Sequence, residues 1–265
     1  MRFTTDKNPP QLRYACYTQK TRAEETFIRE HVLTHILSGS LTIHTVSKNY
    51  NFVAGDTVLF KRNLLAKVTQ LPAPAEDFKS VSVYFEQSVL KNFSTENKIS
   101  PSIPYTGDPV LKLENSSLYE SYTSSLHAYQ QGSANDGLTA LKVKEALMLI
   151  MHLDQGTAAM LFDFSEPLKA DLAEYMNTYF RFNIRINHFA YLTGRSTATF
   201  KRDFAKIFPL SPNKWLQQKR LKEAYELIRR KRMKASHVYL EVGFEDLSHF
   251  SFAFKKAFGK APSLI

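Results

Sequence analysis

The sequence predicts an α+β protein in which a β-rich front half precedes an all-helical rear half. Residues 27–87 consist of short β-branched and aromatic runs that are broken by turn pairs such as Ser38-Gly39 and Gly55-Asp56. From residue 166 onward, strand patterns give way to apolar residues at helical spacing with clear capping residues. The phenylalanines of this rear half also recur after 50 residues, which indicates a structural repeat.

Length and composition narrow the class of protein. The chain has 265 residues, enough for about two domains, and 43% of them are hydrophobic. No run approaches the ~18 apolar residues of a membrane helix, and the first twenty residues lack the apolar core of a secretory signal. The single cysteine, Cys16, can form neither an internal disulfide nor a zinc set. We therefore expect a cytoplasmic protein with no membrane partner, no metal and no cofactor.

The front half, residues 1–155, is expected to form a small β-barrel followed by two helices. The segment SVSVYFE at 80–86 is a further strand candidate, and many short strands separated by turns are typical of a sandwich or a small barrel. Apolar residues at helical spacing then predict helices at about 111–130 and 137–153.

Residues 156–165 are expected to form a linker, in which Ser165 would cap the next helix, and residues 166–265 a helical domain. Helices are expected in this domain at 167–180, 186–192, 197–207, 212–230, 236–242 and 247–257. Their N-cap candidates are Ser196, Ser211, Ser236 and Asp246.

The net charge is confined to the rear half. Residues 166–265 hold 19 of the 35 Lys and Arg but only 9 of the 25 Asp and Glu, so they carry the whole net charge of +10. A neutral front half joined to a basic rear half points to a polyanionic partner for the rear half. A basic domain that is merely soluble is the alternative.

The repeat in the rear half has the form of two helix-turn-helix units. Phe200, Phe204 and Phe208 correspond to Phe250, Phe254 and Phe258, and the caps Ser196 and Asp246 also correspond. Each copy is a short helix, a tight turn and a second helix, and the helix at 212–230 would join the two copies.

In the first unit, the helix face opposite the phenylalanines combines small and cationic residues. It consists of Ala198, Lys201, Arg202, Ala205 and Lys206. Small residues allow close approach to another surface, and arginine can donate two hydrogen bonds to guanine in a major groove. We interpret this face as base-reading; the alternative is a solvated face whose alanines serve helix propensity.

The corresponding face of the second unit differs. It carries Phe252 among Ser248, His249, Lys255 and Lys256. Phe252 would contact thymine methyl groups, pack on another domain or weaken base reading. The two lysines suit phosphate contacts, which position a protein on DNA without reading its sequence.

Three segments carry a family resemblance: HFAYLTGRSTATFKRDFAKIF, SPNKWLQQKRLKEAYELI and VYLEVGFEDLSHFSFAFKKAFGKAPS. Residues 166–265 resemble the DNA-binding domain of AraC/XylS-type transcription regulators, in which two helix-turn-helix units joined by a long helix bind DNA. The resemblance implies a sequence-specific regulator, an activator and not an enzyme, whose partners are double-stranded DNA and RNA polymerase.

The resemblance also assigns roles by position. Base-reading positions of the two units correspond to Thr197, Ala198, Lys201 and Arg202 and to Leu247, Ser248, Ser251 and Phe252. Ser196 corresponds to a cap that also meets a phosphate. With Lys206, Lys255 and Lys256 added, these residues form the expected DNA-binding set. Two positions depart from the family pattern: Tyr239 stands where the family has a small residue, and Phe252 where it often has a polar or basic one.

The front half resembles the cupin-like sensor or dimerisation domain of many members, through ILSGSLTI…FVAGDTVLF. The best likeness is to the subgroup of the type III secretion activator of exoenzyme S, whose front domain answers to partner proteins. This implies a homodimer controlled by a small-molecule effector or a regulatory protein. A cupin-type metalloenzyme fused to a DNA-binding domain is the alternative, with His31, His35 and His44 as candidate ligands; the compact His-x-His pattern of a metal cupin is absent.

Overall fold

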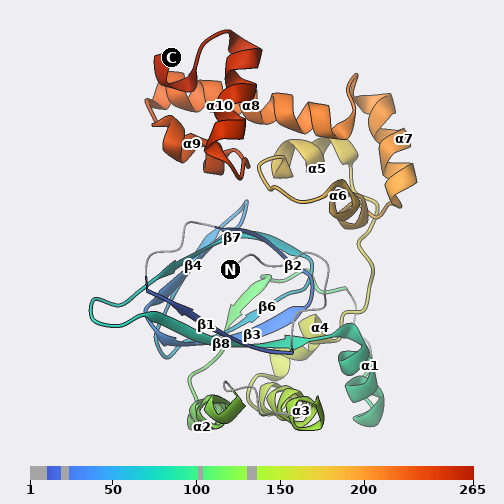
Figure 1. Ribbon diagram of the computed structural model, residues 1–265. Helices are drawn as coiled ribbons and strands as arrows, with labels where there is room; N and C mark the ends of the chain where they lie inside the picture. The colour runs from blue at the N-terminus through green and yellow to red at the C-terminus, as the bar shows by residue number, and fades with distance from the viewer. Residues whose placement is uncertain (1–10, 19–23, 101–103, 130–135) are drawn as a thin grey trace. The chain divides into compact units, whose positions relative to one another are not determined.

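The computed structural model describes residues 11–18, 24–100, 104–129 and 136–265 (Figure 1). The chain forms two compact units, Met1–Ser165 and Glu166–Ile265. Among the described residues, no helix combines the length and the apolar character needed to cross a bilayer.

The front unit contains two antiparallel sheets. The first sheet has five strands in the order β1-β8-β3-β6-β9 and the second has four in the order β2-β7-β4-β5. The strands of the first sheet are β1 (Leu12–Tyr17), β3 (His31–Ser38), β6 (Thr57–Phe60), β8 (Phe78–Phe85) and β9 (Val110–Lys112). Those of the second are β2 (Glu24–Ile28), β4 (Ser40–His44), β5 (Asn49–Val53) and β7 (Leu64–Leu71).

The expected cupin-like barrel is not closed, because its strands divide into these two sheets. The change of sheet occurs at Gly39, between β3 and β4, where φ is +84°. A Cβ atom there would lie 2.3 Å from the carbonyl oxygen of Leu71, so the tight turn requires glycine. An apolar core that includes Ile36 of the first sheet and Ile43 of the second unites the two layers.

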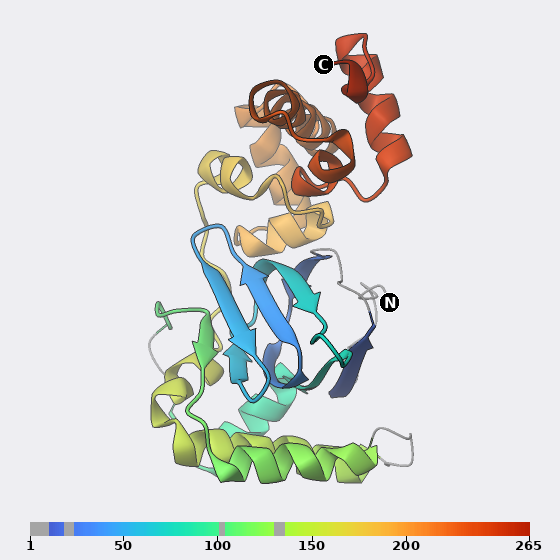
Figure 2. The same cartoon turned by 90° about the vertical axis from the view of Figure 1, so that its left-hand side faces the viewer.

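The other face of the five-stranded sheet is covered by helices, which lie below it in Figure 1 and in Figure 2. The core between them includes Leu33 and Val83 from the sheet and Leu147 from a helix. Because β3 is covered on both sides, six consecutive residues from its start are buried, including the polar His31, Thr34 and His35. The helices of this unit are α1 (Gln87–Glu96), α2 (Ser117–Ser125), α3 (Asp136–Leu153) and α4 (Ala158–Leu161).

Two expectations for this region need correction, and one helix was not predicted. The sequence gives no sign of α1, and the helix expected at 111–130 is a strand to Lys112 and then a helix capped by the Ser116 side chain. Residues 156–165 do not form a free linker, because Phe162 is fully buried and stacks on Phe93 with ring centroids 6.1 Å apart. The expected helix at 137–153 is confirmed by α3.

The rear unit is all helical and contains the predicted repeat. Its helices are α5 (Leu172–Tyr179), α6 (Ile186–Leu192), α7 (Thr197–Ile207), α8 (Pro212–Lys231), α9 (Ala235–Glu241) and α10 (Leu247–Phe258). Helix α5 begins five residues later than expected and is capped by Asp171, not by Ser165. Ser196 and Asp246 are confirmed as caps, whereas Ser236 lies inside α9 and Ser211 makes no side-chain capping bond.

Candidate nucleic-acid interface

Helix α7 is anchored on one side and open to solvent on the other. Its N-terminus is capped by Ser196, whose Oγ accepts a hydrogen bond of 3.2 Å from the backbone N–H of Thr199. Phe200 and Phe204 are fully buried, and the ring of Phe208 lies 4.7 Å from that of Trp215. The opposite face is exposed at Thr197, Ala198, Lys201, Arg202, Ala205 and Lys206.

The two neighbouring arginines of this unit have different surroundings. Arg202 leaves 69% of its side chain exposed, and its Nε atom lies 3.9 Å from Asp203. Arg195 is 7% exposed, and its Nη1 atom donates to the carbonyl oxygens of Ala170 and Thr193. Arg202 is therefore available to a ligand, whereas Arg195 holds the turn in place. Sequence reasoning missed the role of Arg195, because it depends on contacts with residues up to 25 positions away.

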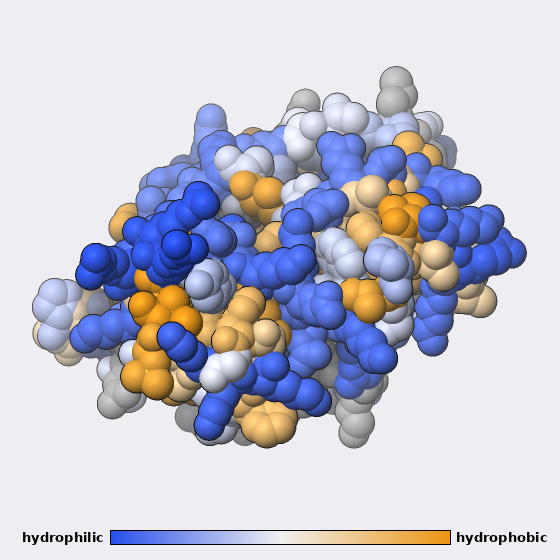
Figure 3. Space-filling model, turned by 90° about the horizontal axis from the view of Figure 1, so that it is seen from above, coloured by the Kyte–Doolittle hydropathy of each residue, from blue (hydrophilic) through white to orange (hydrophobic). Residues whose placement is uncertain are grey.

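Helix α10 repeats this construction. The Asp246 carboxylate accepts a 2.7 Å hydrogen bond from the backbone N–H of His249, and Phe250 and Phe254 are fully buried. On the open side, Phe252 is 71% exposed and Leu247 is 39% exposed. Ser248, Lys255 and Lys256 are exposed and Ser251 is half-buried. Figure 3 shows one face of the molecule, on which hydrophilic side chains surround several small hydrophobic patches.

All twelve expected DNA-binding residues thus lie on the α7 and α10 segments, eleven of them exposed. Tyr239, the other departure from the family pattern, is 6% exposed and lies in the core of the second helix-turn-helix unit. Its ring centroid lies 6.5 Å from that of Phe250. The Tyr239 side chain, which is larger than the small residue of the family pattern, therefore fills space behind α10 and does not lie on the exposed face.

The candidate metal ligands of the front unit are engaged in other contacts. His31 is fully buried, and its Nδ1 atom accepts a 3.3 Å hydrogen bond from the backbone N–H of Arg62. The Nδ1 atoms of His35 and His44 lie 2.9 and 3.0 Å from side-chain oxygens of Thr57 and Asn49. Among the described residues, no three His, Cys, Asp or Glu side chains gather as a metal site would require.

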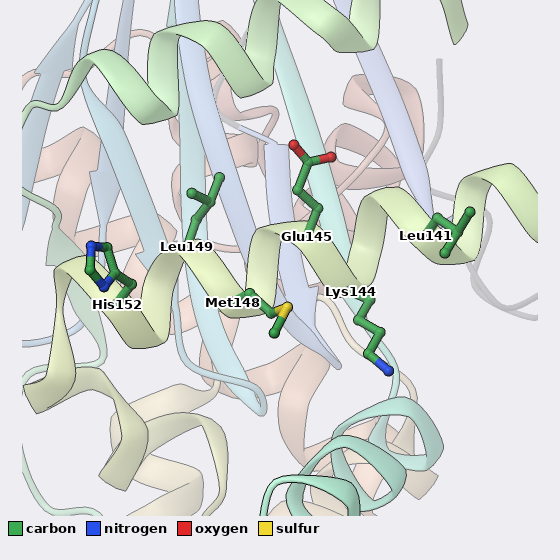
Figure 4. A pocket seen from close by; sticks show the side chains of 6 residues that line it. All are labelled: Leu141, Lys144, Glu145, Met148, Leu149 and His152. Carbon is green, nitrogen blue, oxygen red and sulfur yellow. The ribbon is translucent and has the colours of Figure 1, made fainter.

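A hollow of about 420 Å³ lies along the outer face of α3 (Figure 4). Leu141 and Met148, which line it, are 63% and 54% exposed. Leu138, one turn before Leu141, is 45% exposed. Exposed apolar residues at positions 138, 141 and 148 follow the spacing of a helix that packs against another helix.

Matches to known protein domains agree with the division of the chain into a front and a rear unit. Residues 31–162 match the ExsA N-terminal regulatory domain, and residues 189–264 match a helix-turn-helix domain. The chain is 23% identical over 240 residues to the virulence regulon transcriptional activator VirF of Yersinia enterocolitica, with 86% of each chain covered. It is 21% identical over 254 residues to the HTH-type transcriptional regulator ExsA of Pseudomonas aeruginosa, with 94% of this chain and 90% of ExsA covered. A crystal structure of an apo ToxT variant from Vibrio cholerae is similar at 14% identity and a TM-score of 0.49, with 97% of both chains covered.

The two domain matches together account for most of the chain, and the second includes both α7 and α10. The chain belongs to the AraC-type helix-turn-helix transcription regulators and carries an ExsA-type N-terminal regulatory domain.

Proposed function

We propose that this protein is a sequence-specific DNA-binding activator of transcription. The observation that carries the proposal is the outward face of α7, where Ala198, Lys201 and Arg202 are exposed while the phenylalanines opposite are buried. The concentration of the net charge of +10 in the rear half supports a polyanionic ligand. VirF, which aligns over most of this chain, is by name a transcriptional activator.

In this proposal, α7 lies in a major groove and reads bases. The small side chain of Ala198 lets the helix approach the base edges, and Arg202 donates two hydrogen bonds to a guanine. Thr197 and Lys201 complete the reading face. Ser196 and Lys206 contact phosphates and set the register without reading sequence.

Helix α10 occupies a second major groove. Leu247, Ser248, Ser251 and Phe252 face the bases there. Lys255 and Lys256 neutralise phosphates, so the affinity for DNA should fall steeply with salt concentration.

The test is a gel-shift titration after selection of an operator from a random duplex library. Arg202→Ala should weaken binding by about 1–3 kcal/mol and relax the preference at one base pair. Lys201→Ala should also weaken binding. Lys222→Ala, which removes an exposed cation from α8, is the matched control and should leave base preference unchanged. Unchanged affinity and base preference in Arg202→Ala and Lys201→Ala would contradict the assignment of this face.

The front unit, in this proposal, is regulatory and not enzymatic. It receives the signal, as a small-molecule effector or a regulatory protein, and the DNA-bound protein recruits RNA polymerase in the cytoplasm. The supporting observation is that His31, His35 and His44 each bond to a neighbouring group of the sheets. Metal analysis of the purified protein is the test, because stoichiometric iron or zinc would favour a metalloenzyme.

We further propose that the protein is a homodimer joined through α3. The exposed Leu138, Leu141 and Met148 would be covered by the same face of a second copy. A twofold interface brings each residue of such a face close to its counterparts on the partner, so an apolar stripe complements itself.

A further inference from the structure

The two helix-turn-helix units of the rear half have separate hydrophobic cores. The first core includes Phe200, Phe204 and Leu216, and the second includes Leu221, Phe250 and Phe254. No buried residue belongs to both, although α8 contributes to each. Hydrophobic packing alone therefore does not explain how the two units are held relative to one another.

Arg220 lies on α8 where the first core ends and the second begins. It is 9% exposed and, like the side chain of Arg195, is largely removed from solvent. A buried guanidinium is stable only where its donors are satisfied. Its contacts therefore show what it holds together.

The guanidinium of Arg220 bonds to both helix-turn-helix units. Its Nε and Nη2 atoms donate to the carbonyl oxygens of Phe180 and Phe182, at 2.8 and 2.9 Å. These residues connect α5 to α6 and so belong to the scaffold of the first unit. Its Nη1 atom donates to the carbonyl oxygen of Gly243, at 3.0 Å, in the turn of the second unit.

Neighbouring contacts strengthen this connection between the two helix-turn-helix units at Arg220, which we call the joint. The Asn183 side chain accepts a 3.2 Å hydrogen bond from Arg220 and donates one of 2.8 Å to Glu245, next to the second turn. Gly243 has φ +92°, and a Cβ atom there would lie 2.2 Å from the carbonyl oxygen of Arg181. The backbone segments of the two units thus pack directly against each other beside Arg220.

We propose that Arg220 is a positioning residue that fixes the orientation of α7 relative to α10 and thereby the spacing between the two sub-sites of the operator. This inference rests on the proposed DNA binding. Two recognition helices on one face of a duplex must enter major grooves about one turn, ~34 Å, apart. One inserted base pair moves the second groove by about 3.4 Å and about a tenth of a turn, so a rigid joint rejects it.

Lysine cannot replace Arg220 in this role. The guanidinium is planar and presents five donors in a fixed fork, whereas an ammonium is a single centre on a flexible stem. Lys at this position keeps the charge but cannot reach the Phe180, Phe182 and Gly243 carbonyls together. Arg220→Lys therefore removes the joint while it keeps the net charge that attracts DNA.

The experiment selects operators from a random duplex library with the full-length wild type, Arg220→Lys and the control Lys222→Gln, an exposed position on the same helix. Wild type and Lys222→Gln should return two sub-sites at one spacing. They should bind that operator at least roughly tenfold more tightly than one with an inserted base pair. Arg220→Lys should return several spacings and lose most of that tenfold discrimination, while single-base preferences within each sub-site persist.

A second measurement keeps the inference testable if Arg220→Lys is poorly folded. Spin labels at Lys206→Cys and Lys256→Cys, in a Cys16→Ser background, report the separation of α7 and α10 without DNA. The milder variant Asn183→Ala, at an exposed position, should broaden the distance distribution relative to the wild type. An unchanged spacing preference in folded Arg220→Lys, or an unchanged distribution in Asn183→Ala, would overturn the role of this joint. Failure of the wild type to select any operator would instead contradict the proposed function.

Discussion

Arg195 donates a hydrogen bond from Nε to Asp203 Oδ2 over 3.1 Å, which ties the helix-turn-helix turn to the side of α7. The same guanidinium bonds to the carbonyl oxygens of Thr193 in the turn and Ala170 before α5. The hydrogen bond from Arg195 is the main cause that lowers the pKa of Asp203. The ion pair therefore holds α7 against the turn and lies away from the exposed face of Lys201 and Arg202.

We predict that Asp203→Asn weakens operator binding by roughly threefold to tenfold while base preference persists, because α7 loses an anchor but keeps its reading face. A gel-shift titration measures this effect. Glu226→Gln is the control, since Glu226 forms an ion pair with Arg230 on the exposed side of α8 and such pairs contribute little. Because the pKa of Asp203 is lowered on folding, its contribution is present near neutral pH and is lost as the pH falls below about 4. Equal effects of the two variants would contradict an orienting role for Asp203.

We predict that Phe252 reads a thymine methyl group in the sub-site of α10. The Phe252 side chain is left 71% exposed by the residues that the structure describes, and a thymine methyl would supply an apolar contact for it. Since burying one methyl group contributes about 0.8 kcal/mol, replacing the contacted thymine by uracil should weaken binding about fourfold. Filter-binding titrations with substituted operators measure the change.

The variant Phe252→Ala should remove this sensitivity to uracil, which distinguishes a direct contact from altered DNA shape. Uracil in the sub-site of α7 serves as the control, because its effect should be equal in wild type and variant. Phe252→Ala with unchanged affinity and unchanged sensitivity to uracil would contradict the contact.

Local signals in the sequence predicted most of the rear half but only part of the front half. Caps such as Ser196 and Asp246 and the recurring phenylalanines predicted α7 and α10 closely, because these features act within one helix. The division into two sheets depends on strand pairs far apart along the chain, such as Leu12 with Val83, which periodicity cannot reveal. Helix α1 was missed for a different reason. It lacks the local signals of a helix, namely an acidic first turn, a basic last turn and a side-chain cap.

The candidate site shows the same limit. The exposed face of α7 follows from helical geometry, so Lys201 and Arg202 were found from the sequence. Arg195 and Arg220 were not, because an arginine that bonds to carbonyl oxygens 25 to 40 residues away looks like any other cation in a basic sequence. Sequence patterns therefore identify the exposed residues of a helix face more readily than the residues that hold that helix in place.

We predict that Leu141→Asp and Met148→Asp each convert the proposed homodimer to a monomer at micromolar concentration. Each change places two carboxylates in a twofold interface, which costs desolvation energy that the apolar partner face cannot offset. Sedimentation velocity should show the dissociation constant rise by more than about tenfold, which corresponds to 1.4 kcal/mol. Val46→Asp is the control, because Val46 is 49% exposed on a turn remote in sequence from α3. A dimer that persists in both α3 variants would contradict this interface.

We predict that Glu30 gives the front unit a stability that falls as the pH rises through neutrality. Burial raises the pKa of its carboxyl to about 7, although the Arg62 charge opposes the shift, and its Oε2 atom has no hydrogen-bond partner among the described residues. Between about pH 4.5 and 7 the folded state therefore binds more protons than the unfolded state, so the free energy of unfolding decreases with pH and then levels off.

The neighbouring His31 acts in the opposite direction. Burial lowers the pKa of its imidazole to about 3, so the free energy of unfolding rises with pH until about 6.5. Glu30→Gln should remove the first slope and leave the second. The variant and the wild type should have equal stability at pH 4, and the variant should be more stable by roughly 1 kcal/mol at pH 8, a value reduced for the partial exposure of the carboxyl. Urea unfolding of the full chain at the two pH values, followed by tyrosine absorbance, measures both. A Glu30→Gln variant that is less stable than wild type at pH 8 would show that the carboxylate is held charged by Arg62, contrary to the prediction.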